Sequence, residues 1–502
     1  MYNQIFSHLT LVFVLVGSLL SPSVTLSSFQ GDPIRLTHGP MLGHVTNNSV
    51  RVWCRTSKPG VFKVRLGVTP DSLTDNQQVA QTRIEDDNTG TIEISGLLPD
   101  TKYHYQVWVN ERPHGLPGSF RTLPSKEDSR NEKYNPQGLF NFRFEIGSCA
   151  NQNPLHGIGH RTPTYENLNR DWADKVNFHI MNGDWLYEEQ REYPPEAWRL
   201  TQGVDHLPSV VEIMPTVVGV WENYKLYLSR GNELARWHRN VPSYFTFDDH
   251  ELVNDIWGAG ETGKRHRRTV FRDIGTYAWH NYLGWANPIE NPQRLHFGKG
   301  TMKAGSNLLV DPKADFTQLP LKQMLNLHVH WGTPQAGVND IQYDNDSGHK
   351  NSYVYEIAKV IDAHTLELTA NAKISDTASY SIGRQSYSKF RVANCEYFLV
   401  DTRGSRDMHD VNQRDKKGVS MLGKPQRDWL LRSMRESDAD FFFVISSVPF
   451  MIPHSGAGGF EVAGNKEEAW TAFFDERELL INEWEKIGKK VFVMTGDLHN
   501  SF

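Results

Sequence analysis

Apolar and polar residues alternate with a period of two in the first quarter of the chain. SVRVWCRT (49–56) and FKVRLGV (62–68) place an apolar residue at every second position, and GTIEISGLLPDTKYHYQVWV follows them. This is the period of half-buried β-strands. The pattern predicts a small all-β unit over residues 32–125.

One turn in this unit carries a further signal. Leu98, Pro99, Asp100, Thr101, Lys102 and Tyr103 resemble the corner before a late strand in fibronectin type III and immunoglobulin-like β-sandwiches. Cys54 lies at an inward-facing strand position, so it is expected to be a small core residue.

The pattern changes after a polar, turn-rich stretch at 126–140, which is expected to be a linker. From 141 to 502, short apolar strands alternate with helical segments, and this alternation predicts an α/β layered domain. Residues 295–390 interrupt it with strand-like patterns and little helix, which indicates a β-rich insertion. The sequence stops directly after a predicted core strand, so we expect it to be truncated at its C-terminal end.

The N-terminal end contains one apolar run, LTLVFVLVGSLL at 9–20. It is shorter than the roughly 20 residues that span a bilayer, and small residues follow it. We therefore expect a signal peptide over 1–28 and a secreted, periplasmic or cell-surface protein. A buried N-terminal strand or helix is the alternative. No later stretch is expected to anchor the chain in a membrane.

Composition narrows the class of partner. The net charge of -6 is small for 502 residues, so nothing indicates a nucleic-acid-binding module or an anionic membrane. The three cysteines, Cys54, Cys149 and Cys395, cannot form a disulfide framework. The oligomeric state is left open.

Four predicted strands end in residues that bind metal ions. In an open α/β sheet, ligands bind just beyond the carboxyl ends of the strands. One such cluster alone is a weak signal, but four in the same position indicate a metal site. The segments are FEIGSCANQ with Cys149, FHIMNGDWLYE with Asp184 and Tyr187, YFTFDDHELVND with Asp248, Asp249, His250 and Asn254, and VFVMTGDLHNS with Asp497 and His499.

This residue set suits chemistry at phosphorus. Asp184 has two carboxylate oxygens and can bridge two cations. Two metals about 3.5–4 Å apart can clamp the attacking and leaving oxygens, and they offset the charge of the transition state. A water activated by such a metal is the expected nucleophile.

Together the motifs resemble a known family. Gly-Asp-x-x-Tyr at 183–187 is similar to the metal motif of purple-acid-phosphatase-like metallophosphoesterases. Asp-Asp-His-Glu at 248–251 resembles their Gly-Asn-His-Glu. With Gly-Ser-Cys, Leu-Val-Asp-Thr-Arg and Gly-Asp-x-His, the set resembles the PhoD family of alkaline phosphatase/phosphodiesterases. That resemblance implies a four-layer αββα domain preceded by a β-sandwich.

The resemblance also implies a role for each matching residue. One metal would be ferric iron, because phenolate and thiolate ligands favour a strongly Lewis-acidic ion. A second, harder ion with oxygen ligands would be calcium. The iron ligands would be Cys149, Asp184, Tyr187 and His499, and the calcium ligands would be Asp249, Asn254 and Asp497, with Asp184 bridging.

Three further residues are catalytic candidates. His250 follows a ligand and is the expected general acid or stabiliser of the leaving group. Arg403 is expected to contact phosphate, and Asp401 lies near the same edge.

The sequence departs from the family pattern in three places. Asp497 replaces the first histidine of Gly-His-x-His, which favours a harder second ion. The strand before the last offers Ser446 and Ser447 where many relatives have a histidine, and His454 is the nearest one. The twin-arginine export signal common in PhoD proteins does not occur.

Plainer interpretations remain for several candidates. Asp249 could cap the helix that contains Glu251. Cys149 could be a buried thiol and Tyr187 a packing residue. Asn254 could face solvent on that helix, and His499 could be an incidental loop histidine. His156 and His160 could contact substrate, but we do not expect them to. His328 and His330 could form a metal pair and KRHRR at 264–268 could steer phosphate, but a chance spacing on one strand face and a solvated helix face are the expected interpretations.

The expected function is hydrolysis of phosphate mono- or diesters in small molecules or polymers. Three alternatives stay open. The chain could be an extracellular binding protein on the same fold, a phospholipase D-like phosphodiesterase, or a metal-dependent hydrolase acting on another ester.

Overall fold

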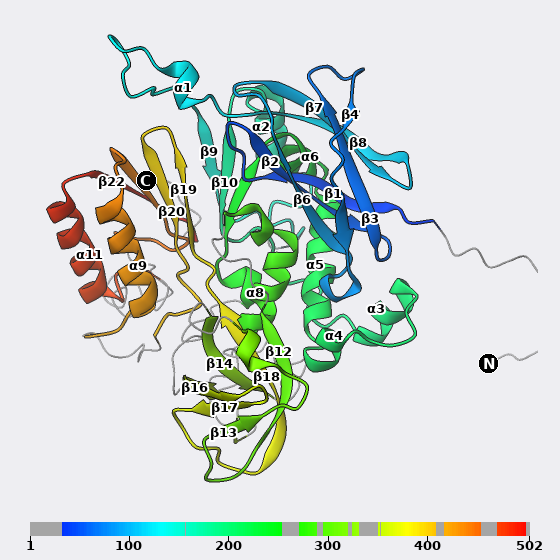
Figure 1. Ribbon diagram of the computed structural model, residues 1–502, viewed down its shortest axis with the longest axis vertical. Helices are drawn as coiled ribbons and strands as arrows, with labels where there is room; N and C mark the ends of the chain where they lie inside the picture. The colour runs from blue at the N-terminus through cyan, green and yellow to red at the C-terminus, as the bar shows by residue number, and fades with distance from the viewer. Residues whose placement is uncertain are drawn as a thin grey trace, which may run out of the picture. The chain divides into compact units, whose positions relative to one another are not determined.

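The computed structural model describes residues 33–155, 157–253, 271–288, 295–319, 324–330, 350–351, 353–407, 416–452 and 469–497 (Figure 1). The expected signal peptide and the basic run at 264–268 lie outside these residues. Within the described part of the chain, no helix is long and apolar enough to cross a membrane.

The alternating segments at the start of the chain form two small sheets. Strands β6, β2 and β1 lie in one, and β4, β3, β7 and β8 in the other, with β5 paired to β3. Their inward residues, Cys54 among them, share one core. The bounds are β1 (Leu36–Gly43), β2 (Ser49–Thr56), β3 (Gly60–Gly67), β4 (Thr74–Asp75), β5 (Ala80–Thr82), η1 (Ile84–Asp86), β6 (Thr89–Ser95), β7 (Lys102–Val109) and β8 (Arg112–Arg121).

The predicted corner is held by a tyrosine hydroxyl. The Tyr103 hydroxyl oxygen accepts a hydrogen bond from the backbone N–H of Leu98 at 2.9 Å. After β8, the stretch expected to be a linker contains the short helix α1 (Lys126–Ser129), capped by the Ser125 side chain. This stretch is therefore locally ordered by its own polar residues.

The first sheet continues into the α/β part of the chain. Its full strand order is β6-β2-β1-β11-β10-β9, and β1 runs parallel to β11 with Gly43 opposite Ser243. The new strands are β9 (Phe144–Gly147), β10 (Phe178–Asn182) and β11 (Ser243–Thr246). Residues Ile34–Phe502 accordingly form one compact unit, in which the N-terminal strands and the α/β part share a sheet.

A second central sheet faces the first. Strands β20, β21 and β22 are parallel, and β19 pairs antiparallel with β20. Aromatic residues of both sheets meet between them; the rings of Tyr244 and Phe390 stack 3.9 Å apart. The bounds are β19 (Ser388–Val392), β20 (Cys395–Leu399), β21 (Phe441–Ile445) and β22 (Lys490–Met494).

Helices pack on both sheets through separate cores. One core joins Met181 and Phe245 to the helices between β9 and β12, and another joins Phe398 and Phe442 to α9 and α11 (Figure 1). The helices are α2 (Pro163–Asp171), α3 (Pro195–Gln202), α4 (Ser209–Ile213), α5 (Val217–Arg230), α6 (Asn232–Asn240), α7 (Asp249–Leu252), α8 (Phe271–Tyr282), η3 (Gly284–Ala286), α9 (Gly423–Glu436) and α11 (Phe474–Ile487).

The expected insertion contains a separate antiparallel sheet of order β15-β14-β18-β12-β13-β17-β16, with its own core. His328 is fully buried on β14 and belongs to none of the metal-type clusters found among the described residues. The bounds are β12 (His296–Met302), β13 (Leu308–Val310), η4 (Phe316–Gln318), β14 (Met324–His330), β15 (Tyr353–Tyr355), β16 (Ile357–Asp362), β17 (Thr365–Leu368) and β18 (Asp376–Arg384).

Candidate metal centre

Three of the predicted ligands turn the chain sharply just after a strand. Cys149, Asp184 and Asp497 have φ values of 61°, 54° and 68°, and each follows the end of β9, β10 or β22 by two or three residues. The left-handed region costs a non-glycine residue energy, and such residues gather at functional sites. Because all three share it, the backbone is shaped to turn at the carboxyl ends of the strands.

Asp184 is the common partner of two other predicted ligands. Its Oδ2 accepts hydrogen bonds from the Cys149 thiol at 3.4 Å and from the Tyr187 hydroxyl at 3.2 Å. Its Oδ1 is buried and has no hydrogen-bond partner. The structure thus brings a thiol, a phenol and a carboxylate to one point.

Further carboxylates surround Asp184. Ligand atoms of Asp184, Asp248, Asp249 and Asp497 all lie within 4.8 Å of one another. Arg403 forms an ion pair with Asp248, and its Nη2 lies 3.5 Å from Oδ1 of Asp249. Oδ2 of Asp248 is buried and has no hydrogen-bond partner. The Arg403 guanidinium therefore lies against two of these four acidic side chains, Asp248 and Asp249.

Glu251 ties two of the strand ends together. Its carboxylate accepts the backbone N–H groups of Asp184 at 2.9 Å and of Asp248 at 2.7 Å. Asp248 is the N-cap of α7 and Asp249 its first residue, so the alternative in which Asp249 is the helix cap is wrong. The spacing Asp-x-x-Glu is that of a capping box and was readable from the sequence.

His250 is held by a neighbouring acid. Its Nδ1 lies 2.6 Å from Oε2 of Glu188, and its ring centroid is 3.8 Å from that of Tyr187. Arg191 donates a hydrogen bond to the backbone carbonyl of His250 at 2.6 Å. These contacts set the orientation of the His250 ring, with Nδ1 directed at Glu188.

A comparison with known families identifies the family of the chain. The sequence profile of PhoD-like phosphatases matches residues 144–309 and 374–502, which include the described ligand candidates. The chain belongs to the PhoD-like phosphatase family. This membership confirms the family resemblance drawn from the motifs and supports a phosphoesterase activity.

Solved structures show the fold alone. A structure of PhoD matches with a TM-score of 0.57 and 16% identity, covering 94% of this chain and 73% of that chain. This likeness confirms a mixed α/β fold with several sheets. Residues 34–125 match the domain of unknown function DUF7800. No curated protein matches the chain.

Smaller domains also match the structure. The fn3 domain of human contactin 1 shows 17% identity and a TM-score of 0.15, over 22% of this chain and 95% of that chain. The sensor domain of the anti-sigma factor RsgI4 in Pseudobacteroides cellulosolvens shows 16% identity and a TM-score of 0.16, over 19% and 98%. These TM-scores are too low to carry an argument.

In the PhoD-like centre, burial and neighbouring acids raise the pKa values of the described carboxyl groups. Burial, reinforced by Cys149 and Asp249, raises the pKa of Asp184 well above its usual value. Burial raises the pKa of Asp248 to about 6 although Arg403 opposes the shift, and burial raises that of Glu251 to about 7. A cation among these groups would stabilise their charged forms.

The pKa values of the thiol and the phenol are also raised. Burial raises the pKa of Cys149 to about 11, and burial together with Asp184 and Cys149 raises the pKa of Tyr187. Burial would lower the pKa of His250, but Asp249 and Glu188 raise it to about 10. The donor set and its unpartnered oxygens therefore fit a bound metal, since ligands must lose their protons to coordinate one.

Arg403 and Asp401 have different surroundings. The Arg403 side chain reaches the acidic cluster, as described above. The Asp401 carboxylate accepts hydrogen bonds from the backbone N–H groups of Arg403 at 2.9 Å and Gly404 at 2.6 Å, and from the Ser386 hydroxyl at 2.6 Å. Asp401 thus holds the loop that carries Arg403.

Ser447 contributes a contact that the sequence did not predict. Its hydroxyl donates a hydrogen bond to Oδ1 of Asp248 at 2.9 Å and lies 2.6 Å from the Thr402 hydroxyl oxygen. At the position where many relatives have a histidine, this chain thus has a serine bound to a carboxylate. Two other predicted ligands, Asn254 and His499, lie outside the described residues, as do His156 and His454.

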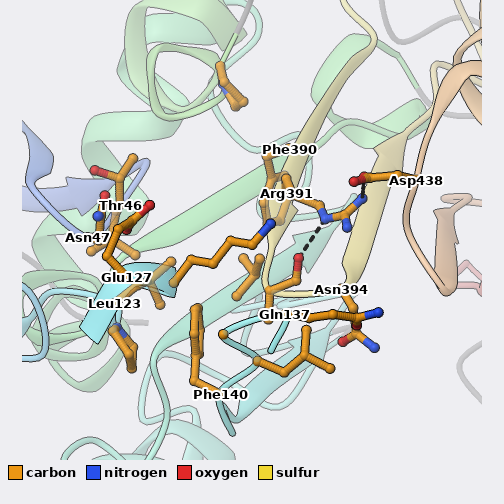
Figure 2. Close-up of a pocket in the computed structure, with 18 of the residues that line it drawn as sticks. Thr46, Asn47, Leu123, Glu127, Gln137, Phe140, Phe390, Arg391, Asn394 and Asp438 are labelled. Carbon is orange, nitrogen blue, oxygen red and sulfur yellow. Dashed lines mark hydrogen bonds and ion pairs between the residues drawn. The ribbon is translucent and has the colours of Figure 1, made fainter. Parts of the chain in front are cut away.

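A separate cavity of about 650 Å³ lies at the opposite ends of the strands. It is lined by the residues before β9, β20 and β21 and by the first turn of the N-terminal unit. Figure 2 shows Arg391 at this cavity beside Asp438, with which it forms an ion pair at 3.2 Å. The metal centre lies beyond the carboxyl ends of the central strands, so this cavity is not part of it.

Proposed function

We propose that this chain is a secreted, metal-dependent phosphoesterase that hydrolyses phosphate mono- or diesters. The observation that carries the proposal is the Asp184 carboxylate. One of its oxygens accepts hydrogen bonds from the Cys149 thiol and the Tyr187 hydroxyl, while the other is buried without a hydrogen-bond partner. Burying such an oxygen is costly unless something compensates it, and a cation supplies that compensation.

The ligand assignment follows the chemistry of the donors. Cys149, Asp184 and Tyr187, with His499, would hold ferric iron. Asp249 and Asp497, with Asn254, would hold calcium, because carboxylate and amide oxygens suit a hard ion. When bound, these metals would supply Lewis acidity and lower the pKa of a water.

Several side chains act without direct coordination. His250 is oriented by Glu188 through Nδ1, so its proton for the leaving oxygen would be carried on Nε2. Arg403 pairs with Asp248 and lies beside Asp249, and its guanidinium would contact a phosphate bound at this cluster. Asp401 supports this arrangement by holding the backbone of Arg403.

The layer order also supports the proposal. The proposed four-layer αββα domain is supported by two facing sheets, each with helices packed on its other side. The proposed fibronectin III- or immunoglobulin-like sandwich of residues 34–125 is supported by the hydrogen bond from the Leu98 N–H to the Tyr103 hydroxyl at the predicted corner. Secretion is supported by the apolar run at 9–20.

Elemental analysis of the purified protein, wild type beside Cys149→Ala, tests the proposal. We expect about one iron per chain together with calcium, and loss of iron in the variant. Nitrophenyl phosphate and its diester should be hydrolysed, with inhibition by orthophosphate. A metal-loaded protein that hydrolyses neither ester contradicts the proposal, and a protein without stoichiometric metal favours the alternative of an extracellular binding protein.

A further inference from the structure

We propose that the N-terminal β unit (residues 34–125) positions the metal-ligand loop, and that Asp87 is the positioning residue through which it acts. The inference rests on the proposed function, since that function defines which loop matters. It gives the unit matched by DUF7800 a role in the active site. The alternative role is that of a detachable docking module.

Asp87 is a buried junction between the two parts of the chain. It follows η1 with a φ of 52° and is fully buried. Within its own unit, each of its carboxylate oxygens accepts a hydrogen bond from Arg55 at 3.0 Å. From the α/β part of the chain, Asp87 accepts hydrogen bonds from Nε1 of Trp198 on α3 at 2.9 Å and from the hydroxyl of Tyr282 on α8. The Lys225 Nζ on α5 lies 3.3 Å from the same carboxylate.

The charges at this junction balance. Arg55 and Lys225 are themselves almost fully buried, and Glu222 pairs with Lys225. Burial would raise the pKa of Asp87, but Arg55 and Lys225 hold it well below its usual range. The carboxylate is therefore a permanent anion that ties Arg55 of the sandwich to Lys225 of α5.

The other side of α5 holds the metal-ligand loop. Asn223 Nδ2 donates to the backbone carbonyl of Tyr187 at 2.9 Å, and its Oδ1 accepts the backbone N–H of Glu189 at 2.8 Å. Arg230, at the end of the helix, forms an ion pair with Glu189. One helix thus fixes the loop just after Asp184.

The loop after Asp184 also packs closely against α5. A Cβ atom added at Gly219 of α5 would lie 2.3 Å from the carbonyl oxygen of Arg191. The loop backbone therefore lies directly on the helix at that point.

The two contacts lie on opposite sides of a rigid element. Lys225 and Asn223 are two residues apart, which is about 200° around an α-helix. Asn223 is fully buried and Lys225 nearly so. A shift of α5 caused by loss of the Asp87 contact is therefore transmitted to the backbone of Tyr187, whose hydroxyl contacts Asp184.

The test compares Asp87→Asn with Val107→Ala in the full chain. Val107 is fully buried in the same β unit and belongs to its core, whereas Trp198 and Tyr282 belong to another core cluster, so Val107→Ala controls for general loss of stability. The readouts are hydrogen exchange of the amides at 187–190 and the rate at which metal is lost to a chelator. Neither readout depends on hydrolysis, so absence of phosphoesterase activity would contradict the proposed function alone.

We expect Asp87→Asn to speed exchange at Glu189 about tenfold or more and to speed metal loss, under conditions where Val107→Ala changes neither. Equal changes in both variants, or none in Asp87→Asn, overturn the proposal. If Asp87→Asn does not fold, Lys225→Met replaces it, because it leaves the Arg55–Asp87 pair in place. We expect a smaller increase of the same kind, and exchange unchanged from wild type overturns the proposal equally.

Discussion

Two buried carboxylates of this chain, Asp87 and Asp184, differ in how their charge is satisfied. Asp87 accepts hydrogen bonds from side chains on four helices or strands, two of these side chains are cationic, and its pKa is held low. Asp184 lies among other acids, has an oxygen without a hydrogen-bond partner, and has a raised pKa. The charge of Asp87 is balanced by cations of the protein, whereas Asp184 lies in the cluster that we propose to hold a metal ion.

This difference separates structural from functional burial of charge. A buried ion pair balances its desolvation cost with partners that fold together with it. A cluster of acids without enough cations destabilises the folded chain until a ligand binds. The two sites should therefore respond in opposite ways to loss of their central charge.

The largest expected effect is on catalysis at Asp184. Asp184→Asn removes the proposed bridging charge, and we expect kcat/KM for nitrophenyl phosphate to fall at least about 10³-fold, which is about 4 kcal/mol. Steady-state kinetics with added iron and calcium measure it. Asp311→Asn, a buried acid of the insertion that contacts Tyr380, is the matched control and should keep near wild-type kinetics. Activity close to wild type in Asp184→Asn contradicts the bridging role.

The next effect is on stability, where the two sites should diverge. In metal-stripped protein, Asp87→Asn leaves Arg55 and Lys225 short of a counter-charge, and we expect the free energy of unfolding to fall by about 3–4 kcal/mol. Asp184→Asn relieves repulsion among buried acids and should raise the free energy of unfolding. Urea unfolding of wild type and both variants measures these free energies. If both substitutions changed the free energy of unfolding in the same direction, the distinction between the two sites would be wrong.

The sequence predicted the positions of the metal-type residues because strand ends are visible in it. The apolar runs before Cys149 and Asp184 mark strands, and their carboxyl ends must lie at one edge of the sheet. The structure brings both residues together with Tyr187. Secondary structure and strand order therefore account for this part of the centre.

Other parts depend on tertiary contacts that no local pattern encodes. Asp87 lies in a polar loop, IEDDNTG, which looks like an exposed turn, and its partners come from positions far along the chain. The pairing of β1 with β11 joins segments about two hundred residues apart. The roles of Glu188 and Ser447 likewise depend on which loops meet, whereas Glu251 was accessible through the capping-box spacing.

A pH series sharpens the account of Asp87. Its folded-state pKa is depressed, so its contribution to stability is present above the unfolded value near 4 and is lost as the pH falls below it. The difference in unfolding free energy between wild type and Asp87→Asn should stay constant from pH 8 to 5. Below about pH 4 it should shrink by about 1.4 kcal/mol per pH unit. A difference that already shrinks between pH 8 and 6 contradicts a permanent anion.

The smallest effect belongs to a surface pair that joins the same two parts of the chain. Lys102 of β7 pairs with Asp174 at 2.6 Å, but their side chains are 40% and 80% exposed. Exposed pairs contribute little because water and salt screen them. We expect Asp174→Asn to change the free energy of unfolding by less than about 0.5 kcal/mol, with no change in hydrogen exchange at Glu189. A loss comparable to that of Asp87→Asn would mean that the contact between the parts matters in general, and that burial of the Asp87 charge does not explain its effect.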